Sequence, residues 1–414
     1  MRRQPVRPIH ERQAPFFVGV DVGKRTHYAA VVDVNGSPCL PKTLKFTNTR
    51  EGYTQVQVAI AEATAQASPT EVTIGCEATG PYWLSLYEAL THAGYRVLVL
   101  NPLYVKARRG TTLRGTKTDP VDALLIATII RQEDVPTSHI PEAAVQGLRE
   151  LTRLRADLIA QIGDVKRRVI AVLDRTFPEF ATCFRDVFGL TARAVLAEWT
   201  LPEQLAAVPT GELTTLLTRL SRGRFGAATA QAIHTAAQHS IGVRRGADAL
   251  AFELRLLLRQ VTYVESQVAE LDQEITRRYG ELDTYLSTIP GLGPATAPAI
   301  YAEIGDMGRF TDSDQLVALV GVDPQLHQSG ETAGQTKMSK RGSPYLRRAI
   351  WHAALTASRL DPMFQAIYDR QRKRGKHHLV ALSHVANKLT RVIYSVLKGQ
   401  RAYVPDYAVG TSGH

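Results

Sequence analysis

The segment FFVGVDVGKRTHYAAVVDVNG, residues 16–36, decides the fold of the amino-terminal part of the chain. Its first eight residues are an apolar stretch that ends in glycine, a pattern typical of a buried strand. A second apolar stretch, residues 27–34, is followed by Asn35-Gly36, a pair typical of the tight turns of β-hairpins. We therefore expect two successive strands at the start of a sheet.

The residues that follow alternate between helix and strand patterns. Apolar stretches that favour strands and amphipathic stretches that favour helices succeed one another at residues 44–49, 51–67, 71–77, 81–94 and 95–102. A hairpin followed by strands that alternate with helices fits an RNase H-like mixed sheet. We expect an α/β domain over residues 15–140, preceded by a flexible basic segment, residues 1–14.

Residues 145–280 carry helical patterns. The most regular is a heptad seam, the spacing of coiled coils, formed by Leu250, Leu254, Leu257, Val261, Val264, Val268, Leu271 and Ile275. A less regular stripe runs from Leu148 to Val172. Two such helices on either side of an insertion at about residues 180–245 favour an antiparallel coiled coil, within one chain or between chains. The alternative is two helices that pack against their own core.

The last folded part is expected over residues 281–403 as a mainly helical domain. It opens with IPGLGPATA, residues 289–297, whose Gly-x-Gly spacing is that of a helix-hairpin-helix motif or of a simple turn. A polar loop, a basic helix from Tyr345 and an amphipathic helix over residues 381–399 follow. Residues 404–414 are expected to be a flexible tail.

The chain is basic, and its charge is unevenly distributed. Fifty Lys and Arg against 39 Asp and Glu give a net charge of +11. Residues 337–401 contain fifteen cations and two acids, so this segment alone carries +13. A second cluster lies between residues 106 and 117 and contains no acid. Such charge indicates a polyanionic partner, nucleic acid in preference to an anionic membrane.

The two basic clusters define the predicted nucleic-acid contacts. They are Lys106, Arg108, Arg109, Arg114, Lys117, Lys337, Lys340, Arg341, Arg347 and Arg348. No apolar run reaches the roughly 18 residues of a membrane span. The three cysteines are scattered and form no metal-binding spacing. We therefore expect a cytoplasmic protein without a membrane partner.

Four acidic residues stand where a metal site could form. Asp21 ends the first strand, and Glu77 ends a later one. Asp119 and Asp122 lie three residues apart in a helical pattern, with Pro120 at the first helical position and Asp119 as its N-cap. Carboxylates in this arrangement suit two Mg²⁺ ions, which prefer oxygen ligands and clamp an in-line phosphoryl displacement. For each residue alone, the alternative is a cap, a turn or a surface acid.

The segment HQSGETAGQTKMSKRGSPYLRRAI, residues 327–350, combines hydroxyl groups with cations. Ser329 precedes a glycine in a polar loop, and the cations downstream could stabilise a phosphodiester under attack. Judged from the residues alone, Ser329-Gly330 is better interpreted as a turn than as a nucleophile. Ser339 and Ser343 are equally exposed candidates for the nucleophile. His327 could act as a base, but a lone histidine in a loop is more often incidental.

Together these motifs resemble the DEDD insertion-sequence transposases, relatives of the pilin-gene inverting recombinase. The resemblance rests on GVDVGK (19–24), CEATGPY (76–82), TKTDPVDA (116–123), IPGLGPATA and the serine segment. Two departures are a longer insertion near residues 180–245 and the basic extension before Pro15. They leave the coiled-coil geometry and the oligomer contacts open.

The resemblance implies a RuvC-like domain joined by a coiled coil to a carboxy-terminal serine transposase domain. In such an enzyme Mg²⁺, or Mn²⁺ in its place, is bound by Asp21, Glu77, Asp119 and Asp122. Ser329 forms a transient phosphoserine link to DNA. The implied partners are donor and target double-stranded DNA, a structured bridge RNA as guide, and further copies of the chain in a dimer or dimer of dimers. The implied location is the nucleoid in the bacterial or archaeal cytoplasm.

Three other functions are compatible with parts of the sequence. A RuvC-like junction-resolving endonuclease would use the four acids and water, but it would not need the large third domain. A sugar-kinase-like ATPase would explain GVDVGK, but it would not explain the basic carboxy-terminal part. A non-catalytic nucleic-acid binder would use the acids only as caps and turns.

Overall fold

The computed structural model describes residues 15–405, with gaps at 79, 110–117, 134, 136 and 138–139 and with only short pieces of the segment 323–341. In that segment the backbone is described at 324–325, 328–329, 332–333 and 337–338, without side chains. The chain divides into two units, Met1–Ile140 and Pro141–His414. The predicted flexible segment 1–14 and most of the predicted tail lie outside the described residues.

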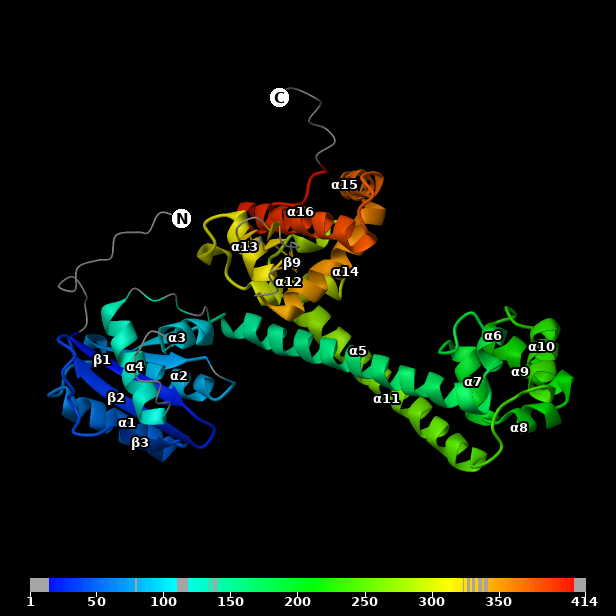
Figure 1. Ribbon diagram of the computed structural model, residues 1–414, viewed down its shortest axis with the longest axis horizontal. Coiled ribbons are helices and arrows are strands. Elements are labelled where there is room, and N and C mark those ends of the chain that lie inside the picture. Colours follow the sequence, from blue (N-terminus) through cyan, green and yellow to red (C-terminus); the bar gives the residue numbers. More distant parts are fainter. Residues whose placement is uncertain are drawn as a thin grey trace, which may run out of the picture. The chain divides into compact units, whose positions relative to one another are not determined.

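A five-stranded mixed sheet forms the centre of the first unit (Figure 1). Its strands are β1 (Phe16–Val22), β2 (Thr26–Asp33), β3 (Leu44–Thr47), β4 (Val72–Glu77) and β5 (Arg96–Leu100). The strand order is β3-β2-β1-β4-β5, in which β1 pairs antiparallel with β2 and parallel with β4. The predicted mixed α/β class is confirmed. β1 and β2 form a hairpin that turns at residues 23–25, whereas the predicted turn pair Asn35-Gly36 follows β2.

Helices cover both faces of this sheet. On one face α1 (Arg50–Ala63) and α2 (Trp83–His92) contribute Ile60 and Leu86 to the core, and a 3-10 turn, η2 (Pro69–Glu71), precedes β4. On the other face α3 (Pro102–Arg109) and α4 (Asp119–Gln132) contribute Val105 and Ile126. β1 and β4 are covered on both sides, and their sequences are apolar apart from Thr73 and the acids near their ends, Asp21 and Glu77.

Two glycines allow α4 to lie directly on the sheet. A methyl group on Gly19 of β1 would lie 2.1 Å from the Ala123 carbonyl oxygen and 2.2 Å from the Ala127 nitrogen, both in the α4 backbone. On β4, a methyl group on Gly75 would lie 2.8 Å from the Ile130 side chain. These distances are shorter than van der Waals contact, so only glycine permits this packing. The close packing brings the start of α4 near the ends of β1 and β4.

Two long helices, α5 (Ala143–Thr176) and α11 (Ala247–Gly280), lie side by side and antiparallel in the second unit (Figure 1). Leu148 near the start of α5 shares a buried cluster with Ile275 near the end of α11. Further along, Ile162 shares a second cluster with Val264 and Val268. The seam of α11 is therefore covered by α5 of the same chain. Pairing between copies of the chain stays a prediction.

Five short helices fill the segment between the two long ones. They are α6 (Phe180–Cys183), α7 (Leu190–Glu198), α8 (Pro202–Ala207), α9 (Thr210–Ser221) and α10 (Ala227–Gln238). Their core includes the neighbouring rings of Phe177, Phe180 and Phe184. Val169 of α5 and Leu254 of α11 belong to the same core, so this small bundle packs on one end of the helix pair.

The remaining helices of the second unit surround a separate core (Figure 1). They are η3 (Leu286–Thr288), α12 (Thr296–Ile304), η4 (Met307–Arg309), α13 (Ser313–Val320), α14 (Pro344–Leu360), α15 (Pro362–Lys373) and α16 (His378–Gly399). The short turn η3 lies between α11 and the Gly-x-Gly segment that leads into α12, and the helix-hairpin-helix stays a prediction. Gly291 has a φ of +93°, and a methyl group there would lie 2.6 Å from the Ala353 carbonyl oxygen of α14. Gly291 therefore serves close helix packing. Within the described part of the chain, no helix has the length and apolar character needed to cross a membrane.

Candidate active site

The carboxylates of Asp21 and Glu77 lie at the same edge of the sheet. Val20 of β1 pairs with Cys76 of β4 in parallel register, so Asp21 and Glu77 are the next residues on two neighbouring strands. Both side chains are half-buried. The carboxyl edge of parallel strands is where open α/β sheets place their ligands.

The start of α4 supplies the other two acids. The helix begins at Asp119, and the extended residue Thr118 is its N-cap, so Asp119 is the first helical residue and not the predicted cap. The reason is that the Asp122 amide already donates to the Thr118 carbonyl oxygen, at 3.0 Å, which closes the first turn. Asp119 is exposed, whereas Asp122 is only 4% exposed.

The other three carboxylates influence the charge of Asp21. The pKa of Asp21 rises from 3.8 to about 6, chiefly because of burial and then because of the charges of Asp122, Asp119 and Glu77. A carboxyl group surrounded by like charges binds a proton or a metal cation more readily than an isolated one. The structure thus brings the four acids singled out from the sequence into one electrostatically coupled group.

Arg109 of α3 provides a positive charge to this group. Its Nε donates to Oδ1 of Asp122 at 3.0 Å, and its Nη2 lies 3.0 Å from Oδ2. The same guanidinium acts to lower the pKa of Asp21. Among the described residues, no three acidic, histidine or cysteine side chains converge closely enough to ligate one metal ion. A bound cation would therefore have to draw the acids together and compete with Arg109.

The other members of the first basic cluster differ in their surroundings. Lys106 is exposed on α3. Arg108 pairs with Glu133 at 2.6 Å and lies 5.5 Å over the Tyr104 ring, so it links α3 to the end of α4. Arg114 and Lys117 lie outside the described residues. Of the three that are described, Lys106 is the one without an ion pair to a described acid.

The segment that carries Ser329 starts and ends at neighbouring points of the second unit. The Ser343 amide donates to the Leu319 carbonyl oxygen at 3.0 Å. A methyl group on Gly342 would lie 1.7 Å from that oxygen, so the chain passes Leu319 as closely as a backbone can. These contacts anchor the end of the segment against α13.

Short backbone ladders run through the serine segment. β6 (Pro324–Gln325) pairs with β9 (Lys337–Met338), and β7 (Gln328–Ser329) pairs with β8 (Thr332–Ala333), all antiparallel. Ser329 pairs with Thr332. The side chains of Ser329 and Lys337 lie outside the described residues, as do His327, Ser339, Lys340 and Arg341.

Ser343, an alternative nucleophile in the sequence, holds the start of α14. Its hydroxyl accepts the Leu346 amide at 3.2 Å and donates to Glu303 at 2.8 Å. Glu303 is 6% exposed and receives two hydrogen bonds from Arg153 of α5, at 2.6 and 3.0 Å. This network fixes the point at which the serine segment rejoins the helices. The sequence did not reveal it, because 150 residues separate Arg153 from Glu303.

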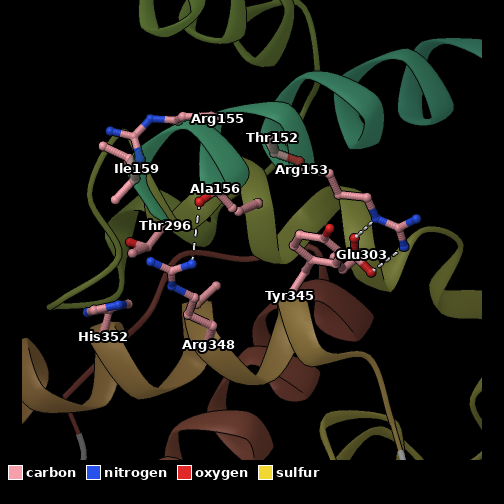
Figure 2. Close-up of a pocket in the computed structure, with 13 residues that line it drawn as sticks. Thr152, Arg153, Arg155, Ala156, Ile159, Thr296, Glu303, Tyr345, Arg348 and His352 are labelled. Atoms are coloured by element: carbon pink, nitrogen blue, oxygen red, sulfur yellow. Dashed lines mark hydrogen bonds and ion pairs between the residues drawn. The ribbon is translucent and has the colours of Figure 1, made fainter. Parts of the chain in front are cut away.

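Figure 2 shows a pocket of about 250 Å³ between α5, α12 and α14. Arg348 of α14 is exposed at this pocket and reaches the Ala156 carbonyl oxygen of α5 at 3.4 Å. His352 lies one turn further along the same helix. Arg347 instead donates to the Val320 carbonyl oxygen at 3.3 Å and supports the end of α13. Of these two predicted nucleic-acid contacts, Arg348 is the more accessible.

Known proteins resemble this chain along most of its length. A model of DEDD transposases of the IS110 type matches residues 18–178, and a model described as transposase of the IS116/IS110/IS902 family matches residues 283–369. An uncharacterised 42 kDa protein of insertion element IS900 from Mycobacterium paratuberculosis is 27% identical over 94% of this chain and 98% of its own.

Two further relatives carry names that state an activity. The mini-circle putative transposase for IS117 from Streptomyces coelicolor is 27% identical over 94% of this chain and 97% of its own. A pilin gene-inverting protein from Moraxella bovis is 23% identical over the same shares. The chain therefore belongs to the IS110/IS116/IS902 family of transposases and recombinases, enzymes that act on DNA.

Proposed function

We propose that this transposase excises and inserts a mobile element by Mg²⁺-dependent strand exchange through a phosphoserine intermediate. The observation that carries the proposal is the coupled acidic group formed by Asp21, Glu77, Asp119 and Asp122, within which burial and like charge raise the pKa of Asp21 to about 6. The five-stranded mixed sheet supports an RNase H-like, RuvC-like assignment for residues 15–140.

The acidic group suits a divalent metal, because all its donors are carboxylate oxygens, two from the ends of neighbouring strands and two from the start of α4. Asp21, Glu77, Asp119 and Asp122 would hold Mg²⁺, with Mn²⁺ as a substitute. When bound, the metal would stabilise negative charge on the reacting phosphate. Arg109 would then release part of its pair with Asp122 and become available to a phosphate oxygen.

Ser329 supplies the nucleophile in this proposal. Its hydroxyl oxygen forms a bond to phosphorus and loses its proton, while the bond from phosphorus to the leaving sugar oxygen breaks and that oxygen takes up a proton. One phosphoester bond replaces another, so the strands can be rejoined to a new partner without ATP. Ser343, which follows this segment, is held against α13 by the bond from its amide to the Leu319 carbonyl oxygen.

The acids and the serine belong to different units of the chain. We infer a composite site, in which the serine domain (281–403) meets the acidic domain (15–140) by folding back or across protomers. The coiled-coil region (145–280) would join them in a dimer or dimer of dimers. The substrates would be donor and target duplex DNA, and a structured bridge RNA would act as guide.

The test is a comparison of serine variants on element-end DNA. The wild-type protein should form a covalent adduct with DNA that survives denaturation, and Ser329→Ala should form none while it binds DNA normally. Ser339→Ala is the matched control and should retain the adduct. Recombination by Ser329→Ala at the wild-type rate would exclude the serine mechanism. DNA cleavage without any adduct, which leaves free 5′-phosphates, would identify a junction-resolving endonuclease that uses the acids and water.

A further inference from the structure

A dense group of cations lies at the turn between α15 and α16 (the turn is seen in Figure 1). It belongs to the basic segment 337–401 but contains none of the nucleic-acid contacts predicted above by residue. This basic turn, residues 370–378, contains Arg370, Arg372, Lys373, Arg374 and Lys376 and no acid. All five side chains are exposed. Five positive charges within seven residues repel one another. The acid next to them in the chain, exposed Asp369, forms no ion pair with them among the described residues.

The backbone of the basic turn is well defined. The Lys376 amide donates to the Gln371 carbonyl oxygen at 3.2 Å, and the Gly375 amide donates to the Arg372 carbonyl oxygen at 2.9 Å. With Gly375 at a φ of +73°, these bonds form the Schellman motif that ends many helices. Buried Phe364 and Gln371 attach α15 to the core. The five cations therefore project from an ordered scaffold, and a polyanion need not order the backbone when it binds.

The cations of the basic turn lack acidic partners. Among the described residues, none of the five is within ion-pair distance of a carboxylate, and the one side-chain bond is from Arg372 to the Lys376 carbonyl oxygen, at 2.7 Å. Arginines on α11 differ: Arg277 and Arg278 both bind Glu274. These two arginines are thus neutralised by an acid, whereas the cations of the basic turn are not neutralised by any described acid.

Helix capping explains only part of this charge. Arg370, Arg372 and Lys373 lie in the last turn of α15 and offset the partial negative charge of its carboxyl end. Arg374 and Lys376 lie beyond the helix, next to the amino end of α16, which carries partial positive charge. Two more cations at that position are unfavourable for the isolated protein, so their placement indicates an external anion.

We propose that the basic turn binds the phosphate backbone of duplex DNA, as a contact separate from the active site and from the contact residues predicted above. The proposal rests on the proposed function only in that the enzyme acts on DNA. Duplex DNA carries one charge per ~1.7 Å of its axis, and exposed cations that displace its counterions gain affinity without reading sequence. Such contacts fix the register of a protein on the duplex. The basic turn would hold DNA that flanks the reacting phosphate.

The test replaces three cations that make no side-chain hydrogen bond or ion pair among the described residues. The variant Lys373→Gln/Arg374→Gln/Lys376→Gln retains Arg370, Arg372 and the Schellman backbone. The control Arg167→Gln/Arg277→Gln/Arg278→Gln removes the same charge from residues that are paired with acids. Binding of the full-length chain to a labelled random-sequence DNA duplex, and to an RNA duplex of equal length, is measured by anisotropy across about 50–200 mM salt.

The proposal predicts that the basic-turn variant binds duplex DNA about 10–100-fold more weakly at 100 mM salt. Its plot of log affinity against log salt should be shallower by about 2–3, since each lost phosphate contact contributes about 0.9. If both triple variants weaken DNA binding equally, the loss of affinity is caused by the net charge and not by the basic turn. If the basic-turn variant weakens binding to RNA alone, the surface binds RNA. Either result would overturn the proposal. Adduct formation at saturating DNA should stay at the wild-type level, which separates this test from that of Ser329.

Discussion

The substitution Asp21→Asn should stabilise the metal-free protein while it abolishes activity. In the absence of a metal, the Asp21 carboxylate is partly buried beside three other acids, and its pKa rises from 3.8 to about 6. This rise corresponds to about 3 kcal/mol of unfavourable interaction at neutral pH. Because the side chain remains partly exposed, screening by water reduces the value to about 1 kcal/mol. The first unit of the variant should therefore melt about 2–4 °C higher than the wild type in EDTA at pH 7.5.

The pH dependence of stability shows whether the Asp21 carboxylate destabilises the folded protein. A carboxyl whose pKa is raised in the folded state binds its proton more tightly when folded, so stability falls as the pH rises from about 4 through about 6. The difference between Asp21→Asn and the wild type should be absent near pH 4 and complete above pH 7. Glu62→Gln removes an exposed carboxylate of α1 and is the control, which should show no such pH-dependent gain.

Thermal unfolding in EDTA and in Mn²⁺ completes the experiment. Added Mn²⁺ should raise the melting temperature of the wild type much more than that of Asp21→Asn, since the metal replaces the proton as the neutralising cation. A metal-free Asp21→Asn variant that is less stable than the wild type at pH 7.5 would refute the reasoning. So would equal stabilisation of both proteins by Mn²⁺.

Three further substitutions test individual contacts. Gly19→Ala should destabilise the first unit by about 3 kcal/mol in chemical denaturation, because the added methyl group would lie 2.1 Å from the α4 backbone. Gly211 has open space around it, so the control Gly211→Ala should not change the free energy of unfolding. An unchanged stability of Gly19→Ala would show that α4 does not pack there. Glu303→Ala should destabilise the second unit by about 2–4 kcal/mol, because it leaves Arg153 and the Ser343 hydroxyl without their partner. Glu303→Gln should reduce the free energy of unfolding by less. Equal reductions for the two variants would contradict the role of the charge. Arg109→Gln should bind Mn²⁺ up to about tenfold more tightly in calorimetry, because the substitution removes the guanidinium that competes with the metal for Asp122. Weaker binding by the variant would show that Arg109 supports the metal site.

Local patterns in the sequence predict much of the first unit. Strands such as 71–77 are visible because a β-strand buried on both faces needs continuous apolar residues. The ends of those strands and the Asp119–Asp122 spacing then single out the acids, because each depends on residues close together in the chain. Even there the helix start is misplaced by one residue, since Thr118 and not Asp119 has the extended backbone of the cap.

Contacts between distant residues are not visible in such patterns. In the sequence, Arg109 is one of several cations in a basic run and nothing distinguishes it from them. In the structure, its guanidinium binds Asp122. Glu303 reads as one acid in an apolar helix, yet it is buried against Arg153 from another helix. In both cases tertiary packing selects the partner. The Gly-x-Gly of IPGLGPATA is a third example, because Gly291 is required by a neighbouring helix.

The most direct test of the central claim is the structure of the wild-type protein assembled on element-end DNA with Ca²⁺ in place of Mg²⁺. The claim is that one phosphate is approached by the acids of the first unit and by the hydroxyl of Ser329. We predict that the Ser329 hydroxyl contacts the scissile phosphate, and that Asp21 and Glu77 hold a cation on the same phosphate. A complex in which Ser329 lies far from the acids in every pairing of protomers would contradict the account.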